Sequence, residues 1–141
     1  MRADEAMAIV AEDIPSILES AGLVNGETLD EDEIAKRDAP IFWPMKAESP
    51  DATGKRIFAV WKIQALEPLA SAENDVECRR ATAYIDFWIM GSPYAGAVKK
   101  AVARASRAFR KDGWEFELNS APYYDSSSKR TQLSYVLTKT I

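Results

Sequence analysis

The fold is decided by the stretch from residue 81 to residue 141, which opens with the sequence ATAYIDFWIM at 81–90. Apolar and other side chains alternate there, and successive side chains of a strand point to opposite faces of a sheet. The pattern therefore predicts a strand with one apolar face, formed by Ala81, Ala83, Ile85, Phe87 and Ile89. Beyond it we expect a helix at 94–111, a strand at 114–118, a loop at 119–129 and a last strand at 130–141.

The expected helix at 94–111 has signals at both ends. Ser92 can cap its free N–H groups, Pro93 suits the first helical position, and Gly113 marks its end. An anion site at this N-terminus is the less favoured interpretation of Gly91, Ser92 and Pro93, because the glycine spacing of a phosphate loop is absent. One side of the helix is apolar at spacings of three and four, through Ala95, Val98, Val102, Ala105 and Phe109.

The rest of the chain supplies a second helix and a second pair of strands. Helical spacing predicts a helix at 3–21, in which Pro15 either causes a kink or starts a second short helix. Strands are expected at 56–66 and 75–90, joined by a hairpin tip at 67–74, and three prolines make the segment 24–55 an extended loop or arm.

These elements define the expected architecture, which is an α+β two-layer sandwich. Its order α-β-β-α-β-β gives a four-stranded, mainly antiparallel sheet with two helices on one face. The length of 141 residues suggests a single domain, 1–141.

The amino-acid composition argues against several classes of protein function. The chain has no histidine, which removes Ser-His-Asp and Cys-His catalysis and the commonest zinc ligand. The single Cys78 cannot form an intrachain disulfide, so we expect assembly in a reducing cytoplasm. No apolar run approaches the roughly 20 residues that span a bilayer. A net charge of −4 argues against general nucleic-acid binding.

No motif indicates an active site. Asp86, Glu115 and Glu117 could combine as paired carboxylates, but they alternate with apolar residues as the solvated faces of strands do. We therefore expect no enzyme, no catalytic residue, no metal and no cofactor.

Charge and aromatic residues offer candidate surfaces instead. An acidic run lies at 27–33, and a basic helix face lies at 99–111. That basic face is interpreted as a solvated face, as a partner for the acidic run of an adjacent copy, or as a nucleic-acid site. Phe42 and Trp43, between two prolines, either close one edge of the core or anchor on a neighbouring subunit. Tyr84 and Trp88 could stack bases or serve a protein interface.

The arrangement of these elements resembles the small tail-completion proteins of tailed bacteriophages, which include the tail terminators. The likeness runs through residues 56–61, 80–89, the helix 93–111, the strand 114–118, the tyrosines at 123–124 and the strand 132–137. It implies a two-layer subunit that assembles as a homo-hexameric ring. Such a ring caps the head-proximal end of the tail tube, stops its polymerisation and docks to the head connector.

The resemblance also implies a location and partners. The chain would be a structural protein of the virion tail or neck, assembled in the bacterial host cytoplasm. Its partners would be further copies of itself, the tail tube protein and the head–tail connector or head-closure protein, with no membrane and no specific nucleic acid. The candidate interface residues are Phe42, Trp43, Glu31, Asp32, Arg104, Arg107, Tyr123, Tyr124 and Lys129.

Two alternatives stay open. The chain could be another neck component, such as a head-closure protein, since the segment 24–55 is longer than in the shorter members of the family and could reach a partner ring. It could instead be a monomeric α+β module that binds nucleic acid or a small ligand on the Tyr84 and Trp88 face of the sheet.

Overall fold

The structure is a computed structural model that describes residues 1–36, 39–44, 57–69, 78–90, 96–127 and 129–141. Its helices are α1 (Ala3–Ser20), the 3-10 turn η1 (Gly26–Thr28), α2 (Glu31–Lys36) and α3 (Gly96–Lys111). Its strands are β1 (Val24–Asn25), β2 (Ile41–Pro44), β3 (Ile57–Pro68), β4 (Arg79–Met90), β5 (Glu115–Leu118), β6 (Tyr123–Asp125) and β7 (Arg130–Thr140).

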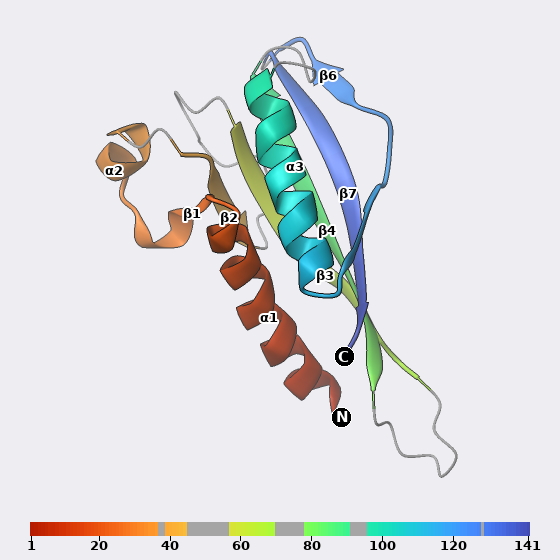
Figure 1. The fold of residues 1–141 in the computed structure, drawn as a ribbon. Helices are drawn as coiled ribbons and strands as arrows, with labels where there is room; N and C mark the ends of the chain where they lie inside the picture. The colour runs from red at the N-terminus through yellow and green to blue at the C-terminus, as the bar shows by residue number, and fades with distance from the viewer. Residues whose placement is uncertain (37–38, 45–56, 70–77, 91–95, 128) are drawn as a thin grey trace.

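All of these strands belong to one mixed sheet. Its order is β1-β2-β3-β4-β7-β5, and β6 also pairs with β7. The β1–β2 and β2–β3 pairs are parallel, whereas β3–β4, β4–β7, β5–β7 and β6–β7 are antiparallel. The long strands β3, β4 and β7 form its centre, and the short strands lie at its two edges (Figure 1).

The main core lies between this sheet and the two long helices. Figure 1 shows α1 and α3 side by side on the same face of the sheet. The apolar side chains of β4 point toward them, because alternate residues of a strand share a face. They meet Val10, Ile14 and Leu18 of α1 and Ala105 and Phe109 of α3, all of which are fully buried.

A second, smaller cluster covers one end of the opposite face. Phe58 and Val60 of β3 point away from the main core and pack with Ile41 and Trp43 of β2. Phe58 lies edge-on to Trp43 and stacked on Trp88, with ring centroids 6.0 and 6.2 Å apart. Leu29, just before α2, and Ile34, within α2, are partly buried against this cluster.

The α+β class is confirmed, but the four-stranded sheet is wrong, because seven strands are present in the part of the chain that the structure describes. The additional strands β1, β2 and β6 lie in segments that were expected to be loops. β1 and β6 are too short to show a period. β2 shows no alternation because Ile41, Phe42 and Trp43 are all buried, as is typical of strands that are covered on both faces.

The segment 24–55 also differs from the expected extended arm. Its described part forms β1, η1, α2 and β2, while residues 45–56 lie outside the described residues. The acidic run proved to be helix-forming: Asp30 Oδ1 accepts a hydrogen bond from Glu33 N (2.8 Å), which is the N-cap interaction that starts α2.

The long helices follow the expected pattern. α1 continues through Pro15 as one element, so the second short helix is absent. Gly22 and Gly113 adopt left-handed φ angles of 94° and 90°, the conformation that terminates helices. The expected cap at Ser92 and Pro93 and the hairpin tip at 70–74 lie outside the described residues.

Candidate functional site

The acidic run forms an exposed surface at the β1 edge of the sheet. Glu27, Asp30, Glu31, Asp32 and Glu33 are all exposed, along η1 and the first turn of α2. Carboxylates there are favoured by the positive end of the helix dipole. Glu31 and Asp32, two of the candidate interface residues, form no ion pair within the described residues.

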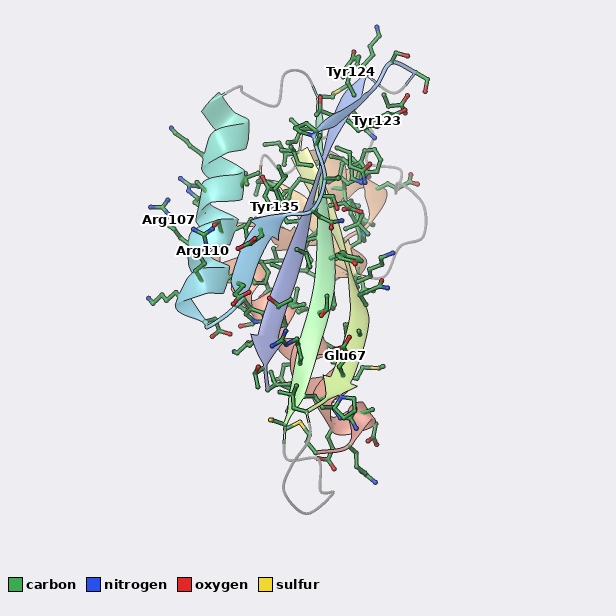
Figure 2. The ribbon with its side chains drawn as sticks, turned by 90° about the vertical axis from the view of Figure 1, so that its right-hand side faces the viewer. Glu67, Arg107, Arg110, Tyr123, Tyr124 and Tyr135 are labelled. Carbon is green, nitrogen blue, oxygen red and sulfur yellow. The ribbon has the colours of Figure 1, made fainter. Side chains whose placement is uncertain are left out.

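The cations of α3 form a second exposed surface. Ala101, Ala105 and Phe109 bury one side of the helix, which leaves the other side to solvent. That exposed side carries Lys100, Arg104, Arg107, Arg110 and Lys111. Figure 2 shows Arg107 on the outer side of α3, whereas Arg110 Nη2 donates a hydrogen bond to Phe116 O of β5 (3.1 Å). Within the described residues, Arg104 and Arg107 have no carboxylate partner.

These two charged surfaces lie on different sides of the subunit. The acidic surface adjoins β1 and β2, at one end of the strand order. The α3 helix runs through Gly113 into β5, at the other end. Figure 1 shows α2 at one side of the sheet and α3 and β7 toward the other. Within the described residues, no ion pair joins the two surfaces.

Tyr123, Tyr124 and Lys129 belong to a hairpin formed by β6 and β7. The two tyrosines are 62% and 56% exposed, and Figure 2 shows them at one end of the sheet. Asp125 Oδ1 accepts hydrogen bonds from Ser127 N (3.0 Å) and Ser127 Oγ (2.8 Å), which tightens the turn. Lys129 is exposed and adopts a φ of 58°. We name residues 123–130 the tyrosine hairpin.

Phe42 and Trp43 occupy a different environment from the other candidates. Their exposures are 0% and 6%, so they offer almost no surface to a neighbouring subunit. Phe42 packs in the main core and Trp43 in the second cluster. The structure thus favours the core interpretation of this pair over the interface one.

The binding face proposed for a nucleic-acid module is partly covered. Trp88 is half-buried and stacks on Phe58 beneath the second cluster. Tyr84 is half-buried, with Lys62 Nζ 5.7 Å from its ring centroid. Both aromatic side chains are therefore partly covered by neighbouring side chains of β3.

The candidate carboxylates do not assemble into a site. Asp86 lies opposite Ser134 in the β4–β7 register, while Glu115 lies opposite Thr138 and accepts its hydroxyl hydrogen bond (3.0 Å). Among the described residues, no three His, Cys, Asp or Glu side chains gather in a way that could hold a metal ion.

A polar junction that the sequence did not indicate joins α1 to the end of α3. Asp13 Oδ2 accepts a hydrogen bond from Trp114 Nε1 (2.9 Å) and lies 3.7 Å from Lys139 Nζ, which also contacts Asp112 Oδ2 at 3.2 Å. Burial raises the pKa of Asp13, and the neighbouring Asp112 carboxyl raises it further. The Trp114 hydrogen bond and the Lys139 charge oppose this shift. The contacts of Asp13 connect α1 to β7 and to the residues that directly follow α3.

An apolar groove between α1 and β3 was also missed. It has a volume of about 620 Å³ and is lined by Met7, Ala11 and Pro15 of α1 and by Trp61, Ile63 and Ala65 of β3. Glu27, which belongs to the acidic surface, is the charged residue of the lining. The signal was present in the sequence, since positions 7, 11 and 15 form a second stripe at helical spacing.

No protein-family model matches the chain, and no curated protein matches it. Among the described helices, none is both long and apolar enough to cross a membrane.

Proposed function

We propose that this chain is a structural virion protein, a tail terminator or tail-completion protein of a tailed bacteriophage. In this proposal it forms a homo-hexameric ring that caps the tail tube, stops its polymerisation and joins it to the head connector. It is not an enzyme and needs no cofactor. Its partners are its own copies, the tail tube protein and a connector or head-closure protein, within the virion neck.

The observation that supports a ring is the pair of opposite charged surfaces on different sides of one subunit. A ring requires heterologous contacts, in which two different surfaces of each copy fit each other. The exposed acids of 27–33 and the exposed cations of α3 have this relation. Because no ion pair joins the two sets in the part of the chain that the structure describes, a neighbouring copy is a suitable partner for both.

The first test is the mass of the purified protein by light scattering, alone and with a tail tube protein. A sixfold mass, or short tubes with one end capped, is the expected result. A protein that stays monomeric in both samples and does not limit tube length would contradict the proposal. A ring that does not act on tubes would favour the alternative of another neck component, such as a head-closure protein.

The monomeric binding module is the second candidate and makes a different prediction. It would use Tyr84 and Trp88, but Trp88 is already stacked on Phe58. Substituting Trp88 by alanine should therefore remove packing from the second cluster and lower stability. A module would lose ligand affinity in this variant, whereas a ring protein would be indifferent to nucleic acid.

A further inference from the structure

The groove between α1 and β3 is an apolar surface without an occupant in the described residues. Met7 of its α1 wall is 52% exposed, so part of the apolar lining is accessible to a binding partner. The volume of about 620 Å³ falls within the range of sites that bury whole side chains or small ligands. The groove is therefore large enough to receive aromatic side chains.

The strand beside the groove is poorly suited to pairing with another strand. β2 pairs with β3 only as far as Trp61, so residues 62–68 have no outer strand among the described residues. The register shifts between Ile63 and Ala65, and the stretch carries Lys62 and ends at Pro68. A bulge, an edge lysine and a proline are the features by which proteins prevent strand addition. An occupant should thus insert side chains rather than add a strand.

The tyrosine hairpin presents such side chains on the other side of the subunit. Tyr123 and Tyr124 are among the most exposed large hydrophobic side chains of the described residues. Leu118 of β5, which is 52% exposed, lies on the same edge of the sheet. Tyrosine is enriched at the centres of protein interfaces, because its ring buries a large area and its hydroxyl can still form a hydrogen bond.

Charge complementarity indicates where this hairpin would dock. Glu27 lies on the groove, and four further exposed acids follow it in 30–33. The hairpin carries the exposed Lys129, and the exposed cations of α3 lie at the same end of the strand order. The groove side thus combines an apolar part with exposed acids, and the hairpin side combines exposed tyrosines with Lys129 and the cations of α3, together with the exposed Glu115 and Glu117 of β5.

We propose that the groove between α1 and β3 receives the tyrosine hairpin of a second copy of this chain. The proposal rests on the ring proposed above and names the surfaces that form its subunit contact. Tyr124 of one copy enters the apolar groove of the next, because neighbouring residues of β6 point to opposite faces and only one of the two tyrosines can do so. The acidic surface at 27–33 then faces the cations of the incoming copy. The contact is heterologous and repeats around the ring.

Site-directed crosslinking tests this pairing directly. Cys78 is first replaced by serine, and two single-cysteine proteins are made in that background, Ala11→Cys and Tyr124→Cys. Mixed and treated with a short bis-maleimide, they should give a covalent dimer, whereas each alone should give little. The matched control is Ser16→Cys, which is exposed on α1 but does not line the groove, and which should not crosslink to Tyr124→Cys.

Substitution of the groove provides an independent readout. Ala11→Trp places a bulky ring in the groove at an exposed position, and should weaken self-association at least about tenfold, as loss of an interface hot spot does. Ser16→Trp adds the same ring outside the groove and should leave association unchanged. Thermal unfolding of both variants checks that the fold is retained.

The outcomes separate this inference from the proposed function. Association that persists without crosslinking, and that is equally sensitive to Ala11→Trp and Ser16→Trp, would overturn the groove contact while leaving a ring intact. Crosslinking of Ala11→Cys chains to each other would overturn it in favour of an isologous dimer. A protein that remains monomeric in light scattering, with or without tube protein, would overturn both.

Discussion

Asp13 shows how one residue sets the pH response of a helix junction. Its pKa is raised by burial and by Asp112, so the folded chain holds a proton on this carboxyl more tightly than the unfolded chain does. A raised pKa for an acid means that stability decreases as pH rises from the ordinary value of 3.8 toward the folded value. Above the folded-state pKa the decrease in stability stays constant, because Asp13 is then charged in both the folded and the unfolded chain.

Asp13→Asn should remove this dependence. An asparagine oxygen can still accept the Trp114 hydrogen bond, and the repulsion by Asp112 disappears together with the attraction by Lys139. In urea unfolding, the free energy of unfolding of the variant should therefore decrease less above pH 3.8 than that of the parent. At pH 7 the free energies of unfolding of the two proteins should differ by no more than about 1 kcal/mol. Glu12→Gln controls for the loss of a negative charge on the same helix. A pH profile identical to that of the parent would contradict this assignment.

Gly26 is needed because the chain passes directly beneath an indole. A Cβ atom at this position would overlap the ring of Trp43 and crowd Ile41. Because Trp43 is itself held in the second cluster, it cannot move aside freely. Gly26→Ala should therefore destabilise the protein by about 1–3 kcal/mol, the usual cost of overpacking.

A double-mutant cycle measures that clash. Trp43→Phe shortens the ring and makes room, so the cost of Gly26→Ala should be smaller in the Trp43→Phe background. Chemical unfolding of the four proteins gives the coupling energy. Strictly additive effects would show that the two residues do not interact.

At the scale of elements, the exposed side of α3 is the part most open to test. Arg104→Glu combined with Arg107→Glu leaves the buried side of the helix unchanged, so the fold should remain. If α3 meets the acidic surface of another copy, self-association should fall at least about tenfold and its salt dependence should decrease. Analytical ultracentrifugation at low and high salt measures both.

The control changes the same number of charges elsewhere. Arg2→Glu with Arg80→Glu alters two exposed cations, at the start of the chain and in β4, that lie outside the groove, and should affect association less. Equal effects of the two pairs would indicate a response to net charge alone. Unchanged assembly and unchanged salt dependence in the α3 variant would contradict the proposed pairing of surfaces.

The elements that could be predicted from the sequence are those with a long regular pattern. α1, α3, β4 and β7 each bury one face more than the other, so their periods are visible. β3 was predicted from its length of 12 residues, although Phe58, Ala59, Val60 and Trp61 are all buried. β2 could not be predicted in this way, because neighbours on both faces bury three consecutive residues and erase the alternation. α2 was not predicted, because its short, mostly charged sequence has no apolar stripe and its start depends on the Asp30 cap.

The candidate site residues could likewise be predicted from the sequence only in part. The charges of 27–33 and of α3 were evident as runs of like residues, and the structure shows them exposed. Phe42 and Trp43 looked like an interface because their prolines suggested a loop, but pairing in the sheet buries them. The stripe at residues 7, 11 and 15 was visible in the sequence, but whether it lines a groove depends on which side of α1 faces the sheet, and spacing alone does not determine that.

At the scale of the whole molecule, opposite charges on different sides give an association with a direction. Two variants with reversed charges test this: Glu31→Lys with Asp32→Lys in one chain, and Arg104→Glu with Arg107→Glu in another. Each alone should be largely monomeric, because like charges meet in every contact. An equimolar mixture should associate again, since each copy then meets a neighbour of opposite sign.

Mixing is the decisive step of that experiment. Mass photometry of the mixture should show the assembly of the parent protein, with the two variants alternating around it. A mixture that stays as monomeric as its components would show that these surfaces do not meet. Association of either variant alone would show the same.

The strand order also has a consequence for synthesis of the chain. β4 pairs with β3, its near neighbour in sequence, and with β7, from which α3, β5 and β6 separate it. A ribosome therefore releases β4 well before the strand that completes its second edge. Pairings of such high contact order form slowly, because the entropy of closing the intervening loop is lost first. Until β7 emerges, the nascent chain exposes one edge of β4, and that interval is when it is most vulnerable to aggregation.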